Sequence, residues 1–491
     1  MSREAADDPP STEGSFRGKG SHNAPPSVVS LFSGIGGFER AFELEGAHAV
    51  LQCESDRFCR AVLQRHWPAG KISNDIRTLS PHEIPDADIW TAGFPCQDVS
   101  LARGNHGRTG LKGNHTSLFF RLADLIEAKR PRVILLENVV GLLNSHKGQD
   151  FAVILRSLTE LGYAVSWRVM NARYFGAPQS RARVFLCAWR GDYSRAVRAL
   201  FESSFGAKVG SERAAFLSEH VHKRTGAIVP QIAYCVAATS GRHTGNDWSR
   251  SYISYADGVR RPTPTESERL QGFPADWTIP HDDLVTPIRG FDSERYRAVG
   301  NAVAIPVVRW IAARIVRLLS ETDAGQPSAF PAATLRLAPD LRRNSTLVSF
   351  DDVETQIERG AFSYRWKAGG CAWARVAVEG AASAAPSKKK EAKFVDALDP
   401  QVPDDRYFLT PNAAVGILRR ADSVGRNLFP PMRQALENLV RGGFGTSAEL
   451  TGITGERIAQ PRLCPPRAEQ RGQVERACER PAGALRDRIR A

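Results

Sequence analysis

The stretch VVSLFSGIGGF, residues 28–38, joins a short apolar run to a turn that contains three glycines. The run Val28–Phe32 predicts a buried strand, and glycines at 34, 36 and 37 permit a tight turn that opens a helix. Three later runs have the same character: AVLQCE (49–54), ADIWTAG (87–93) and RVILLENV (132–139). Apolar residues at helical spacing fill the intervals, at 56–66, 117–129 and 149–161. Strands that alternate with helices predict a doubly wound, mostly parallel α/β sheet.

The rest of the chain divides into segments around this pattern. Two more strands, SWRVMNARYF (166–175) and RVFLCAWR (183–190), complete an α/β domain over residues 27–191. A weakly periodic region follows at 192–258, and residues 259–320 return to the α/β domain, ending in one amphipathic helix predicted over 296–320. For residues 321–440 we expect an accessory segment with linkers at 323–339 and 381–393, a small β piece (344–380) and a helical piece (409–440). The leader 1–26 and the basic tail 441–491 are predicted to be disordered.

Composition and charge narrow the class of protein. The chain has 491 residues, of which 42% are apolar and 24% charged, an ordinary globular composition. Its net charge of +13 is typical of proteins that bind polyanions, although a basic surface without a specific partner would give the same value. Eight cysteines without CxxC spacing predict free thiols and no metal site. Because no secretory signal or long apolar run occurs, we expect a cytoplasmic protein with no membrane partner.

The glycine loop at 32–38 suits a nucleoside ligand. Its glycines let a ligand approach the backbone and the first turn of a helix closely. About twenty residues later the second strand ends in Cys53-Glu54-Ser55-Asp56, where a carboxylate can accept hydrogen bonds from ribose hydroxyls. The loop has neither the GxGxxG spacing of a dinucleotide site nor the GK[ST] of a P-loop. A nucleoside without a phosphate, such as S-adenosylmethionine, fits better; the alternative is an ordinary strand-to-helix turn.

Two reactive side chains follow neighbouring predicted strands. Cys96, in GFPCQDVS (93–100), comes after the strand 87–93, and Glu137 lies in the strand 132–139. Open α/β sheets bind ligands at the carboxyl ends of their strands, so both side chains are predicted to face one crevice. A thiol that attacks and a carboxyl that protonates are what an electron-poor heterocycle requires. A buried structural cysteine is the alternative for Cys96, and we adopt that interpretation for Cys187 and Cys235.

Six motifs, over residues 27–320, resemble those of the cytosine carbon-5 DNA methyltransferases and occur in the same order. They are the cofactor loop FSGIGGF (32–38), the nucleophile loop GFPCQDVS (93–100), the glutamate motif ENVVGLL (137–143), the Gln-x-Arg-x-Arg motif Gln179-Ser180-Arg181-Ala182-Arg183, the strip RPTPTESERLQGFP (261–274) and the last motif GNAVAIPV (300–307). The resemblance implies a Rossmann-like, S-adenosylmethionine-dependent fold.

The resemblance also implies a role for each matching residue. Cys96 would attack carbon 6 of a cytosine flipped out of the duplex, and Glu137 would hold or protonate ring nitrogen 3. Arg183 would contact the cytosine carbonyl oxygen, and Arg181 would steady the loop and the anionic substrate. The cofactor S-adenosylmethionine would be bound by Phe32, Gly34, Gly36, Glu54, Asp75, Ile76, Gly93, Asn301, Ala302 and Val303.

The segments that would contact DNA are less similar to the family. Residues 104–119 resemble a mobile loop that closes over DNA, and 192–258 take the place of a small, irregular target-recognition region, here called the recognition region. It is short, and its stretch 240–250 has side chains suited to base edges. We expect residues 321–491 to be dispensable for catalysis but to raise DNA affinity, with the run 418–420 facing solvent. The alternative is that 406–439 is a displaced recognition element.

These observations predict a DNA (cytosine-5-)-methyltransferase, in restriction-modification or in phage or host DNA protection. Its partners would be double-stranded DNA and a cognate restriction endonuclease that acts separately. We expect a monomer in the cytoplasm, associated with the nucleoid through DNA. The alternatives are a tRNA cytosine-5 methyltransferase, disfavoured because a Cys-Phe-Thr-Lys-type motif is missing, and a catalytically silent DNA-binding regulator. A nicotinamide dehydrogenase is disfavoured by the missing GxGxxG.

Overall fold

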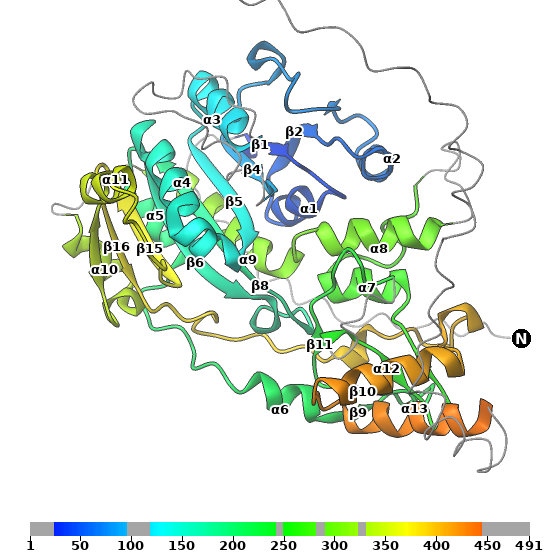
Figure 1. Cartoon of the computed structure of the whole chain (residues 1–491). Coiled ribbons are helices and arrows are strands. Elements are labelled where there is room, and N and C mark those ends of the chain that lie inside the picture. Colours follow the sequence, from blue (N-terminus) through cyan, green and yellow to red (C-terminus); the bar gives the residue numbers. More distant parts are fainter. Residues whose placement is uncertain (1–23, 96–117, 242–248, 281–289, 323–329, 444–491) are drawn as a thin grey trace, which may run out of the picture.

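A central sheet of ten strands organises the chain in the computed structural model, which describes residues 24–95, 118–241, 249–280, 290–322 and 330–443 (Figure 1). The strand order is β14-β16-β15-β6-β8-β5-β4-β1-β2-β3. Neighbouring strands in the run from β5 to β3 pair in parallel. Their bounds are β1 Ser27–Leu31, β2 His48–Cys53, β3 Ile72–Ser73, β4 Ile89–Ala92 and β5 Val133–Val139. The doubly wound α/β fold class predicted from the sequence is confirmed.

The other half of the sheet is antiparallel. Strand β8 pairs antiparallel with both β5 and β6, and β6 pairs antiparallel with β15. The bounds are β6 Tyr163–Asn171, β8 Ala182–Arg190, β14 Thr346–Ser349, β15 Gly369–Trp373 and β16 Val376–Gly380. With this half the sheet reaches ten strands, and β4, β5 and β8 are neighbours in its middle.

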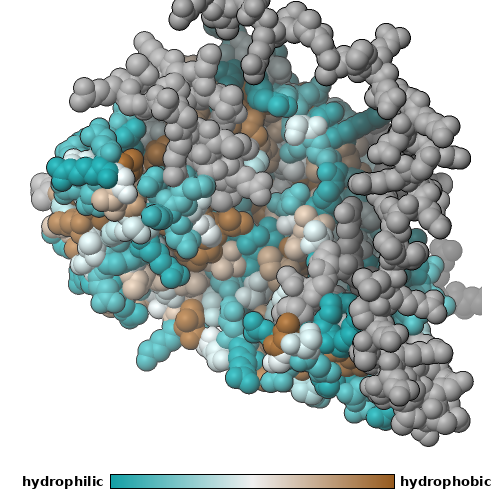
Figure 2. All heavy atoms as spheres, viewed as in Figure 1, coloured by the Kyte–Doolittle hydropathy of each residue, from teal (hydrophilic) through white to brown (hydrophobic). Residues whose placement is uncertain are grey.

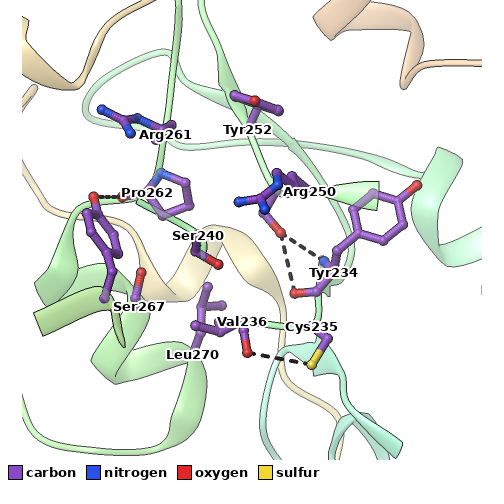
Figure 3. Close-up of a pocket in the computed structure, with 12 residues that line it drawn as sticks. Tyr234, Cys235, Val236, Ser240, Arg250, Tyr252, Arg261, Pro262, Ser267 and Leu270 are labelled. Atoms are coloured by element: carbon purple, nitrogen blue, oxygen red, sulfur yellow. Dashed lines mark hydrogen bonds between the residues drawn. The ribbon is translucent and has the colours of Figure 1, made fainter. Parts of the chain in front are cut away.

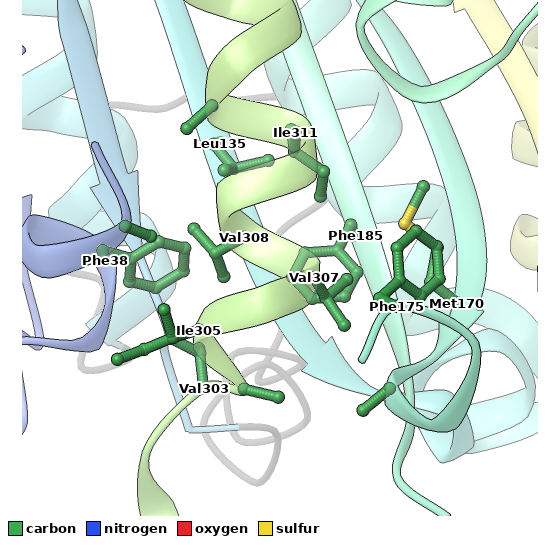
Figure 4. Close-up of a cluster of buried hydrophobic side chains, with 14 of the residues drawn as sticks. Phe38, Leu135, Met170, Phe175, Phe185, Val303, Ile305, Val307, Val308 and Ile311 are labelled. Carbon is green, nitrogen blue, oxygen red and sulfur yellow. The ribbon is translucent and has the colours of Figure 1, made fainter. Parts of the chain in front are cut away.

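Helices cover both faces of the sheet and enclose two apolar cores. Adjacent strand residues such as Val28 and Val29 belong to different cores, as the period-two alternation of a strand requires. One face is covered by α1 Gly37–Glu43, α2 Arg57–His66, α5 Tyr193–Leu200, α9 Ile305–Ser320 and α10 Ala332–Leu337, and the other by α3 Leu118–Lys129, α4 Gln149–Glu160 and α11 Phe350–Glu358. Figure 4 shows Val307 and Val308 of α9 pointing into the cluster that includes Phe38 and Phe185.

The prediction of a single helix over 296–320 is wrong. The chain forms α8 Phe291–Asn301 and α9 Ile305–Ser320, separated at Ala302, whose backbone is extended. Pro306 lies in the first turn of α9, where its missing N–H and fixed φ are tolerated; inside a continuous helix it would remove a hydrogen bond. The break places Asn301 at the end of α8, and Ala302 and Val303 in the turn between the two helices.

A second, smaller unit is built around a four-stranded antiparallel sheet of order β13-β12-β10-β9. Its strands are β9 Glu219–Val221, β10 Ile228–Pro230, β12 Ile253–Ser254 and β13 Val259–Arg260. The short pair β7 Gln179–Ser180 and β11 Ala233–Tyr234 connects this unit to the start of β8. Its helices are α6 Glu212–Leu217, α7 Pro264–Gln271, α12 Pro411–Ser423 and α13 Pro430–Gly443. Short 3-10 helices lie at Pro81–Glu83, Ala172–Tyr174, Pro339–Arg342, Phe394–Ala397 and Asp405–Tyr407, and the segment Val140–Gly148 contains two helical turns separated by a kink at residues 145–147.

The segment predicted as accessory differs from that expectation. Strands β14, β15 and β16 are part of the central sheet, with Cys371 of β15 opposite Ser166 of β6. The buried guanidinium of Arg168 donates hydrogen bonds to the carbonyl oxygens of Ser383, at 2.9 Å, and of Ala385, at 2.5 Å. Residues 344–385 are therefore integral to the α/β domain, and a boundary at residue 320 would remove one edge of its sheet.

Figure 2 shows one face of the molecule with the described residues coloured by hydropathy. Hydrophobic residues on that face occur in small groups between hydrophilic ones (Figure 2). Among the described residues, no helix combines the length and the apolar composition that crossing a membrane requires.

Candidate active site

The predicted cofactor loop and the end of β2 meet as the sequence indicates. Glu54 Oε2 accepts a hydrogen bond from the backbone N–H of Gly34, at 2.8 Å, and its Oε1 accepts one from the N–H of Asp56, at 2.7 Å. An ionised carboxylate has further lone pairs, so Glu54 can still accept from a ligand hydroxyl. Gly34 has φ +55°, and a Cβ built there would meet no described atom within 4 Å. The loop therefore leaves open space beside the Glu54 carboxylate.

The loop also touches the turn between α8 and α9, which contains the last motif. A Cβ at Gly37 would lie 2.8 Å from Cγ2 of Val303, so the close approach of the two segments requires glycine. Ala302 and Val303 are buried, whereas Asn301 is exposed. Phe32, at the start of the loop, has the left-handed φ of 57°, which is rare for a non-glycine residue and often marks a functional turn.

The predicted adenine contacts, Asp75 and Ile76, follow β3. Asp75 forms a paired contact with Arg77, whose Nη2 lies 2.7 Å from Asp75 Oδ2, and hydrogen bonding to Arg77 lowers the pKa of Asp75. The Ile76 side chain is buried, and its carbonyl accepts from Arg121 Nε at 3.2 Å. A ligand amine would have to share the Asp75 carboxylate with Arg77.

Glu137 lies at the carboxyl end of β5 and its side chain is buried. A Cβ at Gly93, after the end of β4, would be 3.8 Å from Glu137 Oε2. Arg183 Nε on the adjacent strand β8 is 3.1 Å from Glu137 Oε1, close enough for an ion pair although this oxygen has no well-aligned hydrogen bond among the described residues. Burial raises the pKa of Glu137, and the charges of Arg183 and Arg181 oppose that rise. The structure thus brings Gly93, Glu137 and Arg183 together.

Cys96 lies outside the described residues, as do 104–117 of the predicted mobile loop and 242–248 of the recognition region. A hydrogen bond from Asn138 fixes the backbone at Phe94, shortly before Cys96. Asn138 Nδ2 donates to the carbonyl of Phe94 at 2.9 Å, and Asn138 Oδ1 accepts from the N–H of Val139, also at 2.9 Å. The side chain after Glu137 therefore fixes the backbone two residues before Cys96.

Arg181 is buried, and its guanidinium is held by backbone carbonyls. Its guanidinium donates to the carbonyls of Val236, at 2.8 Å, and of Ala302, also at 2.8 Å, and to that of Gly300, at 3.2 Å. These carbonyls belong to the recognition region and to the last motif. Arg181 therefore braces segments that are far apart in the sequence, in keeping with the steadying part of its predicted role.

Other side chains in the same network were not predicted. Gln179 is fully buried; its Nε2 donates to Gln271 Oε1 at 2.8 Å, and its Oε1 accepts from the N–H of Val236 at 3.0 Å. Gln271 in turn donates to the carbonyl of Val299 at 3.0 Å. The indole of Trp277 donates to the carbonyl of Ile35 inside the cofactor loop, at 2.8 Å. The motif letters contain Gln179 and Gln271, but no local pattern indicates their partners.

Cys235 differs from its prediction as a buried structural thiol. It is only partly buried and lines a small cavity of about 20 Å³, together with Arg250 and Arg261 (Figure 3). Its Sγ lies 3.4 Å from Arg181 Nη1 and 3.9 Å from Arg183 Nη2. Cys187, by contrast, is fully buried as predicted, and burial raises its pKa. The thiol of Cys235 therefore lies near Arg181 and Arg183, the two arginines close to Glu137.

This arrangement can perform acid–base chemistry on a polar ring. A buried carboxyl with a raised pKa holds a proton more readily than an exposed one and can donate it, and a neighbouring guanidinium can bind a carbonyl oxygen. The loop beside Glu54 can bind a nucleoside at the same edge of the sheet, where open α/β folds place their ligands.

Comparison with known proteins identifies the family. The family described as C-5 cytosine-specific DNA methylase matches residues 27–224 and 211–317, more than half of the chain. The Type II methyltransferase M2.BsuMI of Bacillus subtilis (strain 168) is 34% identical over 307 residues, covering 58% of this chain and 74% of that protein. The Type II methyltransferase M.NgoBI of Neisseria gonorrhoeae is 32% identical over 311 residues, covering 57% of this chain and 90% of that protein. Among solved structures, the Dnmt2 methyltransferase of S. pombe has a TM-score of 0.44 at 18% identity, covering 60% of this chain and 100% of that one.

The motifs, their placement around one edge of the sheet and the family match agree with one another. The chain belongs to the C-5 cytosine-specific DNA methylase family, and it is a DNA (cytosine-5-)-methyltransferase that uses S-adenosylmethionine as its methyl donor.

Proposed function

We propose that this enzyme methylates carbon 5 of a flipped cytosine through a covalent bond between Cys96 and carbon 6 of the ring. The observation that carries the proposal is the buried carboxyl of Glu137, which lies beside Gly93 on the strand that leads to Cys96 and contacts Arg183. A stacked base cannot reach such a buried group, so the cytosine must leave the helix.

Glu137 is assigned to ring nitrogen 3. Because burial raises its pKa, the carboxyl holds a proton more readily than an exposed glutamate and can donate it to nitrogen 3 as the Cys96 thiolate attacks carbon 6. The new bond makes carbon 5 nucleophilic, so that carbon 5 would take the methyl group as the methyl–sulfur bond of the sulfonium breaks and S-adenosylhomocysteine leaves. Loss of the carbon-5 proton to a base then restores the ring double bond and expels Cys96 as thiolate.

The two arginines have different tasks. Arg183 is partly exposed, at 19% of its side chain, and contacts Glu137, so it can donate to the cytosine carbonyl oxygen. Arg181 is a positioning residue in this proposal, because its hydrogen bonds go to the backbone of Val236, Gly300 and Ala302. Charge on Arg181 also favours an anionic substrate nearby.

The residues of the loop fit S-adenosylmethionine. The open space at Gly34 and the remaining lone pairs of Glu54 suit a ribose, and the charge of Asp75 suits an amine. The methionine end is assigned to Phe32, Gly36, Gly93, Asn301, Ala302 and Val303, and the adenine to Asp75 and Ile76. When bound, S-adenosylmethionine supplies an electrophilic methyl group.

The biological setting follows from the relatives. The relatives are called Type II methyltransferases, which supports a role in restriction-modification, with a cognate endonuclease acting as a separate protein on the same sites. We further propose that the enzyme acts as a monomer on double-stranded DNA, in the cytoplasm and at the nucleoid.

A duplex containing 5-fluorocytosine tests the covalent step, since the proton needed to release Cys96 is replaced by fluorine. With S-adenosylmethionine we expect the native protein to form an adduct that survives denaturing gel electrophoresis. The variant Cys96→Ser should form none, although it still binds DNA. Cys235→Ser is the matched control, because Cys235 is a partly exposed thiol near the same arginines, and it should keep the adduct. Loss of the adduct in Cys235→Ser alone, or no adduct in a native protein that methylates DNA, would overturn the assignment of Cys96.

A further inference from the structure

The helices α12 and α13, here called the C-terminal helix pair, pack against the recognition region. They share a separate apolar core with Tyr252 and Val259, to which the pair contributes residues such as Ile417 and Leu436. Hydrogen bonds tie the segments together: the backbone N–H of Leu409 donates to Val259 O at 2.8 Å, and the side-chain Nδ2 of Asn438 donates to Ala256 O at 3.0 Å. The pair thus lies beside strands β12 and β13 although about 150 residues separate them in the sequence.

The C-terminal helix pair supplies one of the layers of the smaller unit. Tyr252 belongs to the core under the helix pair, whereas the next residue, Ile253, belongs to the core shared with the α/β domain. Side chains alternate across a strand, so the two sides of the small sheet face different partners. The recognition region, only 67 residues long over 192–258, therefore depends on a distant segment to cover one face of its sheet. The short length noted in the sequence has a structural explanation.

Residues 406–443 carry an excess of positive charge, although Arg406 lies 3.4 Å from Asp292. Residues 406–443 contain six arginines and two carboxylates. Both carboxylates are bound by one residue, because Arg433 contacts Asp422 at 2.8 Å and Glu437 at 3.0 Å. Arg419 and Arg426 are exposed, and neither contacts a carboxylate in the part of the chain that the structure describes. The charge left on this surface is therefore complementary to a polyanion.

We propose that the C-terminal helix pair is a part of the DNA-recognition unit and that Arg419 and Arg426 bind phosphates of the duplex beside the target cytosine. This inference rests on the proposed function, since it assumes that the recognition region lies on DNA. Half or more of protein–DNA hydrogen bonds go to phosphate and sugar, and such contacts set the register of the protein without recognising the sequence. Arg419 is exposed, as expected, and the helix that carries it packs against the recognition region, which supports a phosphate contact.

The test compares the full-length double variant Arg419→Ala, Arg426→Ala with the native protein. Arg359→Ala is the matched control, because Arg359 is also exposed and follows α11, at the opposite end of the molecule from α12 (Figure 1). The dissociation constant is measured between 50 and 200 mM salt for an unmethylated duplex that contains a site which the native protein methylates. S-adenosylmethionine binding and the positions of methylated cytosines are measured in parallel.

For two lost phosphate contacts, the slope of log affinity against log salt should become shallower by about two. The ratio of the variant and native dissociation constants should accordingly shrink about tenfold from 50 to 200 mM salt. The charge reversal Arg419→Glu, Arg426→Glu should weaken binding further. Binding of S-adenosylmethionine and the set of methylated sites should stay as in the native protein.

Each other outcome overturns the inference. An unchanged salt slope in both variants means that the surface does not touch DNA, and an equal change in Arg359→Ala means that only net charge matters. A changed set of methylated sites means that the arginines contact bases and not phosphates. If the native protein itself neither binds nor methylates DNA, the proposed function fails; if it methylates normally and the variants match it, only the present inference fails.

Discussion

Glu39, in the first turn of α1, is a carboxyl whose proton should stabilise the fold. Its side chain is buried, and burial raises its pKa from 4.5 to about 7 despite contacts with Ser30, Ser33 and Gln52. Within the described residues, neither Glu39 Oε2 nor Gln52 Oε1 has a hydrogen-bond partner. A protonated Glu39 could donate to the Gln52 oxygen, which an ionised one could not, since carboxylates only accept.

The size of the effect follows from linkage between protonation and folding. A rise from 4.5 to about 7 is about 2.5 units, and each unit corresponds to about 1.4 kcal/mol. The folded state binds the proton more tightly than the unfolded state, so this stabilisation is complete below pH 4.5 and is lost as the pH rises to 7. Glu39→Gln removes the charge and supplies a donor. It should therefore raise the free energy of unfolding by up to about 3 kcal/mol at pH 8, with little change at pH 4.5.

Urea unfolding of the full-length protein at pH 5, 6, 7 and 8 measures this difference. The native free energy of unfolding should fall relative to that of Glu39→Gln between pH 5 and 7. Glu358→Gln, at the exposed end of α11, is the control and should run parallel to the native protein. If the curve of Glu39→Gln also runs parallel, or if the variant is the less stable protein at pH 8, Glu39 is not a buried charge and the reasoning fails.

Three further outcomes are expected. Glu54→Ala should weaken S-adenosylmethionine binding by about 10- to 100-fold, the value of one charged hydrogen bond, with a smaller effect on kcat; an unchanged dissociation constant in calorimetry would remove Glu54 from the site. Trp366→Ala should lower the free energy of unfolding by about 3–5 kcal/mol, because the buried indole donates to Gly148 O at 2.9 Å; a loss below about 1 kcal/mol would contradict the packing. A chain that ends at Ser320 should fail to fold, as judged by circular dichroism, because it lacks β15; a folded product that binds S-adenosylmethionine would show that the edge strands are optional.

Strands β1, β2, β4 and β5 of the parallel half could be predicted because each coincides with a short apolar run, whereas the two-residue strand β3 was not predicted. A small β piece was expected over 344–380, but the pairing of its strand β15 with β6 could not be predicted, because the sequence of β15, GGCAW, begins with two glycines and gives a weak strand signal. Packing explains those glycines: a Cβ at Gly370 would lie 2.3 Å from the ring of Trp167 on β6. The information that defines this strand is therefore in a residue about 200 positions earlier, where no local pattern could reveal it.

The candidate site likewise contains residues that the sequence predicts and residues that it does not. Glu137, Arg183 and Glu54 could be predicted because motif and chemistry coincide at each position, and the structure brings Glu137 close to Arg183 and Glu54 close to Gly34. Asn138 could not, because its side chain donates a hydrogen bond to the carbonyl of Phe94, which follows the neighbouring strand β4 and is 44 residues away in the sequence. Cys235 was assigned to the interior from its residue type, and only the tertiary structure puts its thiol beside two arginines.

The late position of β15 has a consequence for synthesis of the chain on the ribosome. Strand β6 ends at Asn171, and its partner β15 begins at Gly369. At about 5–20 residues per second, roughly 10 to 40 seconds pass between the two. Throughout that interval a nine-residue, largely apolar strand has unpaired N–H and C=O groups along one side, the kind of edge that pairs with other chains. Newly made protein should therefore be most prone to aggregation just before its last strands emerge. Slower synthesis or a bound chaperone over that period should change the yield of folded protein.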